Sequence, residues 1–403
     1  MKVLLINTSE TAGGAAIAAA RLMEALNQNG VKAKMLVRDK RTERLTVAAL
    51  PPSPLLWFKF AWERGIIWLH NRFSMRNLWQ LDVANVGTDI TALPEFQEAD
   101  VIHLHWVNQG FLSLSDLRRI LQSGKRVVWT LHDQWPYTAI CHYSGDCQRY
   151  QQSCHHCPQL QAPSAHDLSW RVFQQKKALL RQYHVTFVGC SQWIADLARK
   201  SSLLTGQKVV SIPNAIPSAV FHPMDRAAAR MEHHLPLNRQ LVLFGSFKVT
   251  DERKGVRYLA EAYKLLAQKP AIVVVGQATE AVATLFGNDF YCVDYITDEH
   301  RMASLYAAVD AYVTPSLQDN LPNTIAEAMS CGTPCVGFAT GGIPEMIDHL
   351  QNGYVAKYCD AADLARGIEY VLSHDLSQQA HDKAAYKYSE VHVAQQYIKQ
   401  YEE

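Results

Sequence analysis

The feature that most constrains this 403-residue chain is a repeated alternation of short β-branched apolar runs with longer amphipathic segments. Short apolar runs are typical of buried strands, whereas apolar residues at every third or fourth position are typical of helices. Strands that are apolar on both faces alternate with helices in parallel sheets, because a helix crosses over the sheet before each new strand. The pattern therefore predicts an α/β fold with doubly wound parallel sheets.

The predicted elements form two series along the chain. In the first series the strands are Val3–Asn7, Ala33–Val37, Val101–His105, Val127–Leu131, Thr186–Gly189 and Val209–Ile212, and the helices are Ala15–Asn27, Trp170–Tyr183 and Gln192–Lys200. In the second series the strands are Leu241–Gly245, Ile272–Gly276, Tyr291–Tyr295, Ala311–Thr314 and Cys335–Phe338, and the helices are Val256–Ala267, His300–Ala308, Asn323–Met329 and Ala361–Leu372. A last helix is predicted over Ser389–Glu403, with Val391, Tyr397 and Tyr401 as its packing face.

A proline-bearing segment, Pro213–Pro223, separates the two series. The chain is too long for one comfortable core, and domains of roughly 100–200 residues are usual. We therefore expect a first domain over residues 1–215, with residues 386–403 packing back onto it, and a second domain over residues 216–385. Ligands of doubly wound sheets bind beyond the carboxyl ends of the strands, so we expect the two domains to face a central cleft.

Charge and composition argue against several classes of protein. The formal net charge is +1, which gives no overall attraction to nucleic acid. Four consecutive apolar residues precede Asn7, too few for a signal peptide, and no stretch approaches the roughly 18 apolar residues of a membrane-spanning helix. Nine cysteines, an odd number, favour a reducing compartment. We expect a cytoplasmic protein.

The segment Pro315–Met346, PSLQDNLPNTIAEAMSCGTPCVGFATGGIPEM, carries two acidic residues around a predicted helix start. Pro322 suits the first helical turn, where a missing N–H costs nothing. Asp319 is then expected in the loop before the helix, and Glu327 in its first or second turn. The exposed N–H groups of the helix start suit a diphosphate, and the carboxylates suit hydroxyl groups. For the acidic pair alone, an ordinary capped surface helix remains the alternative.

This segment resembles the donor-binding signature of the retaining glycosyltransferases of family 4, in which an acidic residue, seven others and a glutamate grip a nucleotide sugar. The resemblance implies that Asp319 contacts the donor sugar and that Glu327 binds the ribose hydroxyls. It also implies that Asn320, Leu321 and Thr324 line the donor site. The family more often has glutamate at the first acidic position, and the aspartate of this chain is one methylene shorter.

Lys254-Gly255 lies between the first strand and the first helix of the second series and matches a basic element of the same family. A lysine at the carboxyl end of a strand can neutralise a leaving diphosphate. The family usually has a second basic residue after the glycine of this strand. Here Ser246 occupies that position and Lys248 is the nearest cation. We expect a catalytic Lys254 and a donor-site Ser246, and a solvated charge run is the alternative.

Two motifs of the first series also follow strands. Gly13-Gly14 links the first strand to the first helix, where the family uses a glycine pair for the close approach of donor phosphates or acceptor. His132 ends the fourth strand, and the resemblance implies that it contacts the transferred sugar, with Asp133 as a weaker companion. For the glycines the alternative is a small-residue packing turn, and for His132 the alternative is a structural role.

Cys141, Cys147, Cys154 and Cys157 lie in one turn-rich segment, CHYSGDCQRYQQSCHHCPQL. Four thiolates at such spacing suit a structural, tetrahedral zinc ion. A disulfide pair and free thiols are the alternatives. Similar clusters follow the His-Asp strand in some capsular and colanic-acid glycosyltransferases.

The segment Pro54–Phe73 combines Trp57, Trp62 and Trp68 with Lys59, Arg64 and Arg72. Such an aromatic and basic helix suits the bilayer interface, and its charges exclude a membrane span. A lid over the acceptor and a core helix are equally open. Peripheral contact through residues 54–73 would place the protein at the inner face of the membrane.

The resemblance extends over most of the chain and implies the GT-B architecture, with two Rossmann-like domains. The implied activity is transfer of a hexose-type sugar, with retention, from a nucleotide diphosphate sugar to a hydroxyl of a glycan or lipid-linked acceptor in surface polysaccharide biosynthesis. No cofactor or catalytic divalent metal is implied. Two alternatives are a GT-B nucleotide-sugar epimerase and a non-catalytic sugar-nucleotide binding protein.

Overall fold

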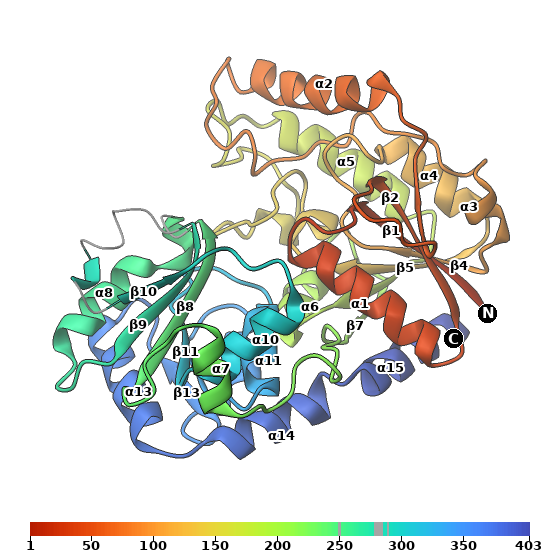
Figure 1. The fold of residues 1–403 in the computed structure, drawn as a ribbon. Coiled ribbons are helices and arrows are strands. Elements are labelled where there is room, and N and C mark those ends of the chain that lie inside the picture. The colour runs from red at the N-terminus through yellow and green to blue at the C-terminus, as the bar shows by residue number, and fades with distance from the viewer. Residues whose placement is uncertain (249–250, 278–284, 288–289) are drawn as a thin grey trace. The chain divides into compact units, whose positions relative to one another are not determined.

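The computed structural model describes residues 1–248, 251–277, 285–287 and 290–403, with side chains of 246–248 and 277 excluded (Figure 1). The chain divides into two compact domains. The first consists of Met1–Pro213 and Ala394–Glu403, and the second of Asn214–Val393.

The first domain is built on a seven-stranded sheet in the order β3-β2-β1-β4-β5-β6-β7. Every neighbouring pair of its strands is parallel. The strands are β1 (Lys2–Ser9), β2 (Lys32–Asp39), β3 (Val47–Ala49), β4 (Val101–Leu104), β5 (Arg126–Leu131), β6 (Thr186–Gly189) and β7 (Lys208–Ser211). The strand order reverses between β1 and β4, and ligands of doubly wound sheets bind at the carboxyl ends of such strands.

The helices of the first domain cover this sheet and bury its apolar side chains. They are α1 (Gly14–Gln28), α2 (Pro54–His70), α3 (Pro94–Glu98), α4 (Leu114–Gln122), α5 (Leu168–Leu180) and α6 (Gln192–Arg199). Several begin at a polar cap: Ser113 and Asp116 form a capping box on α4, and Asp167 caps α5. The core joins Ile102, Trp129 and Phe187 of the strands to Phe173 of α5.

The last helix, α15 (Glu390–Glu402), contributes its C-terminal part to the first domain. The buried hydroxyl of Tyr397 lies 2.9 Å from Thr130 Oγ1, and that of Tyr401 lies 2.7 Å from His103 Nδ1. The expected packing face is therefore correct for both tyrosines. It is wrong for Val391, which is 54% exposed because it precedes the part of the helix that packs on the sheet.

The second domain repeats the layout with a six-stranded parallel sheet in the order β10-β9-β8-β11-β12-β13. Its strands are β8 (Leu241–Lys248), β9 (Ala271–Gln277), β10 (Phe290–Val293), β11 (Ala311–Thr314), β12 (Cys335–Phe338) and β13 (Gly353–Ala356). The described helices are α7 (Arg226–Glu232), α8 (Val256–Leu265), α10 (Glu299–Ala308), α11 (Asn323–Ser330), α12 (Ile343–Met346), α13 (Ala361–Ser373) and α14 (Ser377–Lys387). Here the strand order reverses between β8 and β11.

The sequence prediction located most strands and missed β3 and β13. Both are edge strands: β3 has three residues, and β13 begins with a glycine. Neither carries the long apolar run of a central strand, so the apolar pattern gives no signal for them. The predicted α/β class with two doubly wound parallel sheets is confirmed.

Candidate active site

The second domain brings together Lys254 and Asp319 at the carboxyl ends of β8 and β11. Lys254 Nζ lies 2.8 Å from Asp319 Oδ2, and the two side chains are 35% and 18% exposed. Since β8 and β11 flank the reversal of strand order, the ion pair occupies the place where doubly wound sheets bind ligands. A cation and a carboxylate that remain partly exposed there can meet opposite ends of one ligand.

Two glycines allow the close backbone packing around this ion pair. Gly255 has a φ of 68°, and a Cβ atom there would lie 2.0 Å from the carbonyl oxygen of Pro315. Gly341 has a φ of 56°, and a Cβ atom there would lie 1.6 Å from the carbonyl oxygen of Asp319. Only glycine combines a positive φ with such an approach. The Lys254-Gly255 and Gly341-Gly342 turns therefore pack directly against the loop that carries Asp319.

Glu327 lies in the second turn of α11 and is 7% exposed. The hydroxyl of Tyr306, on α10, donates a hydrogen bond of 3.1 Å to Glu327 Oε2. Burial and the Glu327 carboxylate raise the pKa of Tyr306 well above its ordinary value, so this hydroxyl remains a donor. Tyr306 therefore orients Glu327. No local sequence signal indicated this residue, because its partner lies on a different helix.

The other expected donor-site residues surround the start of α11. Asn320 and Leu321 are buried before the helix, and the Asn320 carbonyl accepts a 2.8 Å hydrogen bond from the Gly342 N–H. Thr324 forms a side-chain hydrogen bond with Tyr312 of β11. Ser246 lies in β8, and its side chain falls outside the described residues.

In the first domain, Gly13 and Gly14 connect β1 to α1. Gly13 has a φ of 88° and a ψ of 164°, a backbone conformation that essentially only glycine adopts. Apart from Gly13 and the residues adjacent to it in the chain, no atom of the described residues lies within 4 Å of the position that a Cβ atom would take at Gly13. The turn thus leaves open space beside the start of α1, at the carboxyl end of β1.

His132 follows β5 and meets a second histidine at the end of β4. Its Nε2 lies 2.9 Å from Nδ1 of His105, which the sequence prediction did not single out. Burial lowers the pKa of His132 to about 4 although Asp133 opposes that shift, and the pKa of His105 also lies well below its ordinary value. The His132 ring is therefore neutral near pH 7, and it suits hydrogen bonding rather than charge stabilisation.

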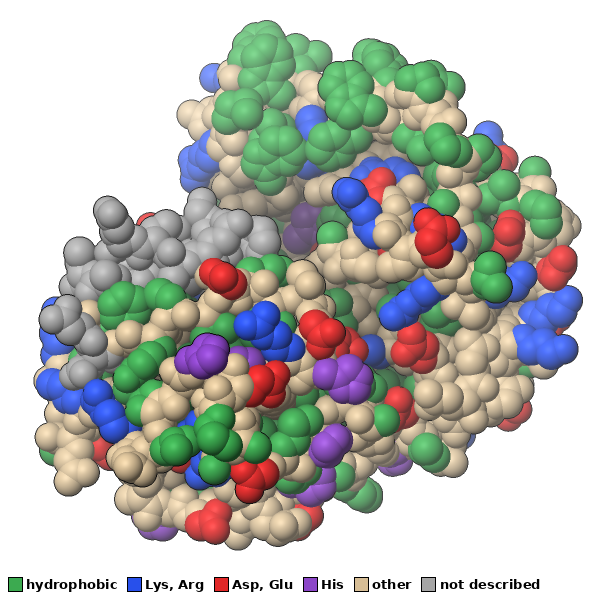
Figure 2. All heavy atoms as spheres, viewed as in Figure 1, with side chains coloured by type: hydrophobic (Ala, Val, Ile, Leu, Met, Phe, Trp, Pro, Cys, Tyr) green, Lys and Arg blue, Asp and Glu red, His purple; other side chains and the backbone are tan. Residues whose placement is uncertain are grey.

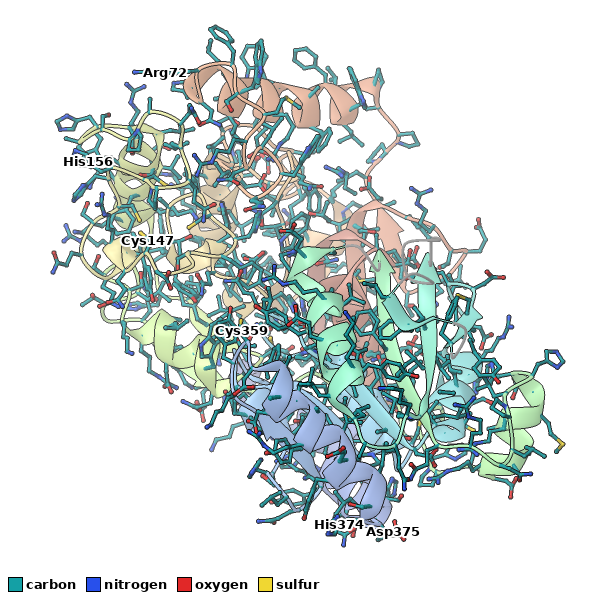
Figure 3. The ribbon with its side chains drawn as sticks, turned by 90° about the vertical axis from the view of Figure 1, so that its left-hand side faces the viewer. Arg72, Cys147, His156, Cys359, His374 and Asp375 are labelled. Carbon is teal, nitrogen blue, oxygen red and sulfur yellow. The ribbon has the colours of Figure 1, made fainter. Side chains whose placement is uncertain are left out.

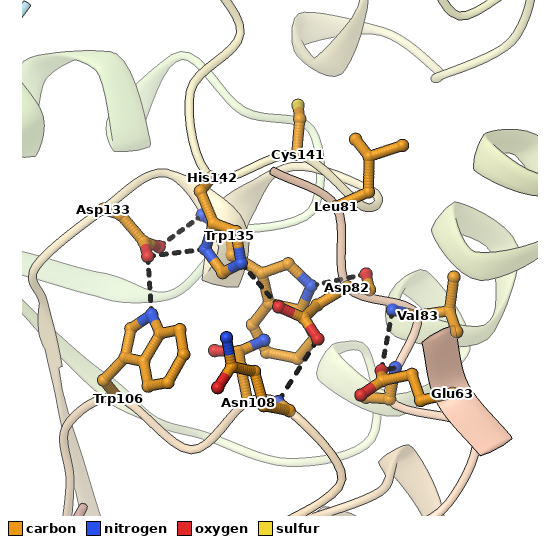
Figure 4. Close-up of polar contacts among 12 residues, drawn as sticks. Glu63, Leu81, Asp82, Val83, Trp106, Asn108, Asp133, Trp135, Cys141 and His142 are labelled. Atoms are coloured by element: carbon orange, nitrogen blue, oxygen red, sulfur yellow. Dashed lines mark hydrogen bonds and ion pairs between the residues drawn. The ribbon is translucent and has the colours of Figure 1, made fainter. Parts of the chain in front are cut away.

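Asp133 belongs to a buried network of alternating charges (Figure 4). It accepts hydrogen bonds of 2.8 Å from Trp106 Nε1 and 2.6 Å from His142 Nδ1. His142 Nε2 lies 2.6 Å from Asp82 Oδ2, and Asp82 Oδ1 pairs with Arg64. Burial opposes charge on His142, but Asp133 and Asp82 outweigh it and raise its pKa to about 10. The ring is therefore an imidazolium between two carboxylates.

The four cysteines of the predicted zinc site gather in one part of the first domain, where their thiols interact electrostatically. Among the described residues, which include Cys141, Cys147, Cys154 and Cys157, no three His, Cys, Asp or Glu side chains are arranged to hold a metal ion. Figure 3 shows Cys147 and His156 in the irregular part of the first domain. All four cysteines are free thiols, and burial raises the pKa of Cys141 to about 12 and that of Cys157 to about 11. A bound metal ion would lower these pKa values, so the zinc site stays a prediction.

Helix α2 has two different faces. Its buried residues are Glu63, Arg64 and Ile67. Trp57, Trp62 and Trp68 are 72%, 50% and 40% exposed, so the core-helix alternative fails for the tryptophans. The expectation that Arg64 belongs to an exposed basic face of this helix is wrong, because its guanidinium points into the domain and pairs with Asp82. None of the helices in the described ranges is both long and apolar enough to cross a membrane.

Two protein-family profiles match this chain over most of its length. A family profile described as Glycosyltransferase Family 4 matches residues 12–220, and one described as Glycosyl transferases group 1 matches residues 238–374. The chain belongs to glycosyltransferase family 4. The predicted family resemblance is thereby confirmed.

Curated relatives of this family 4 chain match it in part. The chain is 25% identical over 265 residues to WcaC of Escherichia coli K12, which is named provisionally as a colanic acid biosynthesis glycosyl transferase. This match covers 61% of the chain and 62% of WcaC. It is 23% identical over 202 residues to N-acetyl-alpha-D-glucosaminyl L-malate synthase of Bacillus anthracis, covering 48% of this chain and 52% of that protein. The matches thus span less than two thirds of these relatives.

Solved structures match this family 4 chain over its whole length. Sucrose-phosphate synthase from Thermosynechococcus elongatus has a TM-score of 0.70 at 20% identity, covering 100% of this chain and 98% of that structure. HepE from Anabaena, solved in complex with UDP and glucose, has a TM-score of 0.65 at 16% identity and 99% coverage of both chains. These likenesses confirm the predicted GT-B fold of two Rossmann-like domains.

Proposed function

We propose that this protein is a retaining glycosyltransferase. It moves a hexose-type sugar from a nucleotide diphosphate sugar to a hydroxyl of a glycan or lipid-linked acceptor in surface polysaccharide biosynthesis. The second domain (residues 216–385 in the sequence prediction) binds the donor, and the first (residues 1–215 with 386–403) binds the acceptor.

The observation that carries this proposal is the 2.8 Å contact between Lys254 Nζ and Asp319 Oδ2 at the carboxyl ends of β8 and β11. A lysine so placed can stabilise the negative charge that develops on a leaving diphosphate. Asp319 can accept hydrogen bonds from the hydroxyls of the sugar that the diphosphate carries. Glu327, held by Tyr306, accepts hydrogen bonds from the ribose hydroxyls.

The reaction exchanges one bond at the anomeric carbon for another. The bond to the diphosphate oxygen breaks, and a bond to the acceptor hydroxyl oxygen forms on the same face of the sugar. The acceptor proton passes to the departing phosphate, so no enzyme nucleophile is required. His132, neutral near pH 7, hydrogen-bonds the transferred sugar.

The ligands and names of similar proteins support the class of substrate in this proposal. The HepE structures contain UDP and glucose or UDP-glucose, by their titles. A Campylobacter jejuni relative, 30% identical over 156 residues, is named N,N'-diacetylbacillosaminyl-diphospho-undecaprenol alpha-1,3-N-acetylgalactosaminyltransferase, which describes a lipid-linked acceptor. Its match covers 37% of this chain and 41% of that protein. We extend both features, a nucleotide diphosphate donor and a lipid-linked acceptor, to this chain.

Incubation with a panel of nucleotide sugars, with and without polyprenyl-diphosphate-linked glycans, tests the proposal. We expect release of free nucleoside diphosphate that depends on the acceptor, and a product whose anomeric configuration, read by proton NMR, equals that of the donor. An inverted product contradicts retention. An epimerised donor supports the epimerase alternative, and binding without turnover supports a non-catalytic protein.

We also propose that α2 contacts the inner face of the membrane as a peripheral element. Apolar side chains gather over α2 in Figure 2, and the exposed ones include Leu55, Trp57, Phe58, Trp62, Trp68 and Leu69. Tryptophan side chains favour the bilayer interface, because their rings are apolar and their N–H groups remain hydrated.

Co-sedimentation with vesicles of phosphatidylglycerol and phosphatidylethanolamine tests this contact. A variant with Trp57→Ser, Trp62→Ser and Trp68→Ser should lose most vesicle binding. Tyr386→Ser, at a 77% exposed aromatic on α14, serves as the matched control and should bind as wild type. Equal binding by the triple variant and wild type would favour the acceptor-lid alternative.

A further inference from the structure

Asp82 lies at the centre of the buried network in the first domain, although no sequence motif includes it. The residue is 0% exposed. Its Oδ1 pairs with the Arg64 guanidinium and accepts a 3.2 Å hydrogen bond from the Gln109 N–H. Its Oδ2 lies 2.6 Å from His142 Nε2, and its carbonyl oxygen accepts a 2.8 Å hydrogen bond from Trp135 Nε1 (Figure 4).

These partners come from three separate parts of the domain. Arg64 belongs to α2, Gln109 to the loop after β4, and Trp135 and His142 to the segment after β5. A single carboxylate therefore connects the segments that follow two neighbouring strands of the sheet. Both segments start at the edge of the sheet where ligands of this fold bind.

His142 extends the connection from Asp82 to Asp133. Asp133 accepts hydrogen bonds from His142 Nδ1 at 2.6 Å, Trp106 Nε1 at 2.8 Å and the Trp135 N–H at 2.9 Å. Along Arg64, Asp82, His142 and Asp133 the charges alternate in sign. The free energy needed to remove such charges from water offsets most of their mutual attraction. A buried network of this kind therefore fixes the geometry of its residues more than it stabilises the domain.

We propose that Asp82 is a positioning residue for the sugar-transfer reaction. It holds the segment that carries His132 and Asp133 against the loop that follows β4. His132 immediately precedes Asp133, and its Nε2 lies 2.9 Å from His105 Nδ1 at the end of β4. The relative placement of the two segments thus sets the position of the His132 ring. The kinetic part of this proposal rests on the proposed glycosyltransferase activity.

Asp82→Asn is the sharpest variant, because it preserves the size of the side chain, the main-chain contacts and one acceptor oxygen. It replaces the other oxygen by an N–H₂ group, which cannot accept a hydrogen bond, so either Arg64 or His142 loses its acceptor. Asp310→Asn is the matched control. Asp310 pairs with Arg230 at 2.8 Å and with Arg226 at 2.9 Å, and it precedes β11, at the opposite end of that strand from Asp319.

We expect Asp82→Asn to lower kcat by on the order of 100-fold, because a misplacement near 1 Å has about that effect on a positioned group. Donor KM should stay near the wild-type value. Hydrogen exchange should speed up at residues 105–110 and 130–137. Asp310→Asn should keep the wild-type kcat, even if its melting temperature falls as far as that of Asp82→Asn. A wild-type kcat and wild-type exchange in Asp82→Asn would overturn the proposal.

Trp106→Phe provides a second variant if Asp82→Asn fails to fold. It replaces the indole by a smaller phenyl ring and so removes the N–H that reaches Asp133 from the loop after β4, and it should reduce kcat by about tenfold. An unchanged kcat and exchange pattern in Trp106→Phe would also contradict the positioning role. If wild type transfers no sugar from any donor, the proposed function fails, and the exchange comparison of Asp82→Asn with Asp310→Asn still decides whether Asp82 holds the two segments together.

Discussion

Lys254 Nζ and Asp319 Oδ2 lie 2.8 Å apart although 65 residues separate them in the chain. Each follows a different strand, and β8 and β11 are hydrogen-bonded neighbours. The contact therefore depends on parallel pairing of these strands and on the glycine turns that pack beside them. Because both side chains remain partly exposed, the ion pair contributes little to stability and is available to a ligand.

Replacing Lys254 should affect catalysis far more than folding. Lys254→Ala should lower kcat/KM by about 100- to 1,000-fold, the usual effect of removing one group that stabilises developing negative charge. The melting temperature should stay near that of wild type, because the ion pair is partly solvated. Steady-state kinetics and thermal melts measure both effects. Arg253→Ala is the matched control: this neighbouring, 59% exposed cation pairs with Asp251, and its loss should leave kcat/KM nearly unchanged.

Glu327→Gln should weaken donor binding while the protein keeps its fold. The amide can still accept the hydrogen bond from Tyr306, so the buried hydroxyl keeps a partner. The lost charge weakens the hydrogen bonds from the ribose, which are worth about 1.5–3 kcal/mol each when they reach an ionised group. Calorimetric titration with the donor should show an affinity lower by about 10- to 100-fold. Glu261→Gln, an exposed change on α8, is the control, and unchanged affinity in Glu327→Gln would refute the ribose assignment.

Gly341→Ala should disrupt the donor site by a backbone collision. The added methyl group would lie 1.6 Å from the carbonyl oxygen of Asp319, which belongs to the main chain and cannot rotate away. Gly332→Ala is the control, since Gly332 also has a positive φ, of 78°, but no described atom lies closer than 3.7 Å to its Cβ position. Both variants bear the strain of the left-handed conformation, about 1–2 kcal/mol. Only Gly341→Ala should also lose donor affinity; equal affinities in the two variants would contradict this.

Glu63 should make the first domain less stable as the pH rises. Burial, and then the neighbouring Asp82 carboxylate, raise the pKa of Glu63 to about 8 from its ordinary value of 4.5. Between these values the folded state holds a proton that the unfolded state has released, so the free energy of unfolding falls as pH rises. Above about pH 8 both states are deprotonated and the effect of Glu63 is constant.

Glu63→Gln tests this pH dependence. The amide mimics the protonated acid and can still accept from the Val83 and Ala84 N–H groups, which now reach Oε1 at 3.0 and 2.7 Å. All nine tryptophans lie between residues 57 and 193, so their fluorescence in urea titrations reports unfolding of the first domain. The decline in stability between about pH 5 and pH 8 should be smaller in the variant than in wild type. Parallel pH curves would show that Glu63 is ionised throughout.

Much of the donor site could be predicted from the sequence, because its determinants are local. The sequence predicts Pro322 in the first helical turn, whereas the structure has it at the N-cap of α11, one residue earlier; Asp319 still lies in a loop and Glu327 on the helix. Gly255 and Gly341 sit where the backbone has positive φ, a requirement that the residue type itself reveals. The charge and hydroxyl partners of these residues could not be predicted in the same way. Tyr306 reaches Glu327 from another helix, and no spacing rule links the two.

In the cysteine segment the spacing predicts zinc, and the thiols lie near one another, but no three metal-binding side chains of the described residues take up an ion-binding arrangement. Spacing along a segment without regular structure does not determine where its side chains point. The same segment instead places His142 between Asp133 and Asp82. This contact spans 60 residues on one side and 9 on the other.

The sequence by itself determined the α/β class, the two doubly wound sheets and the residues that follow β8 and β11, because apolar periodicity and glycine or proline positions act over a few residues. The tertiary structure alone decided which charges are buried together around Asp82, which face of α2 carries the exposed tryptophans, and that Arg64 points inward. Those outcomes depend on long-range packing: a charge is buried only where the whole domain supplies an opposite charge and hydrogen bonds to offset its desolvation.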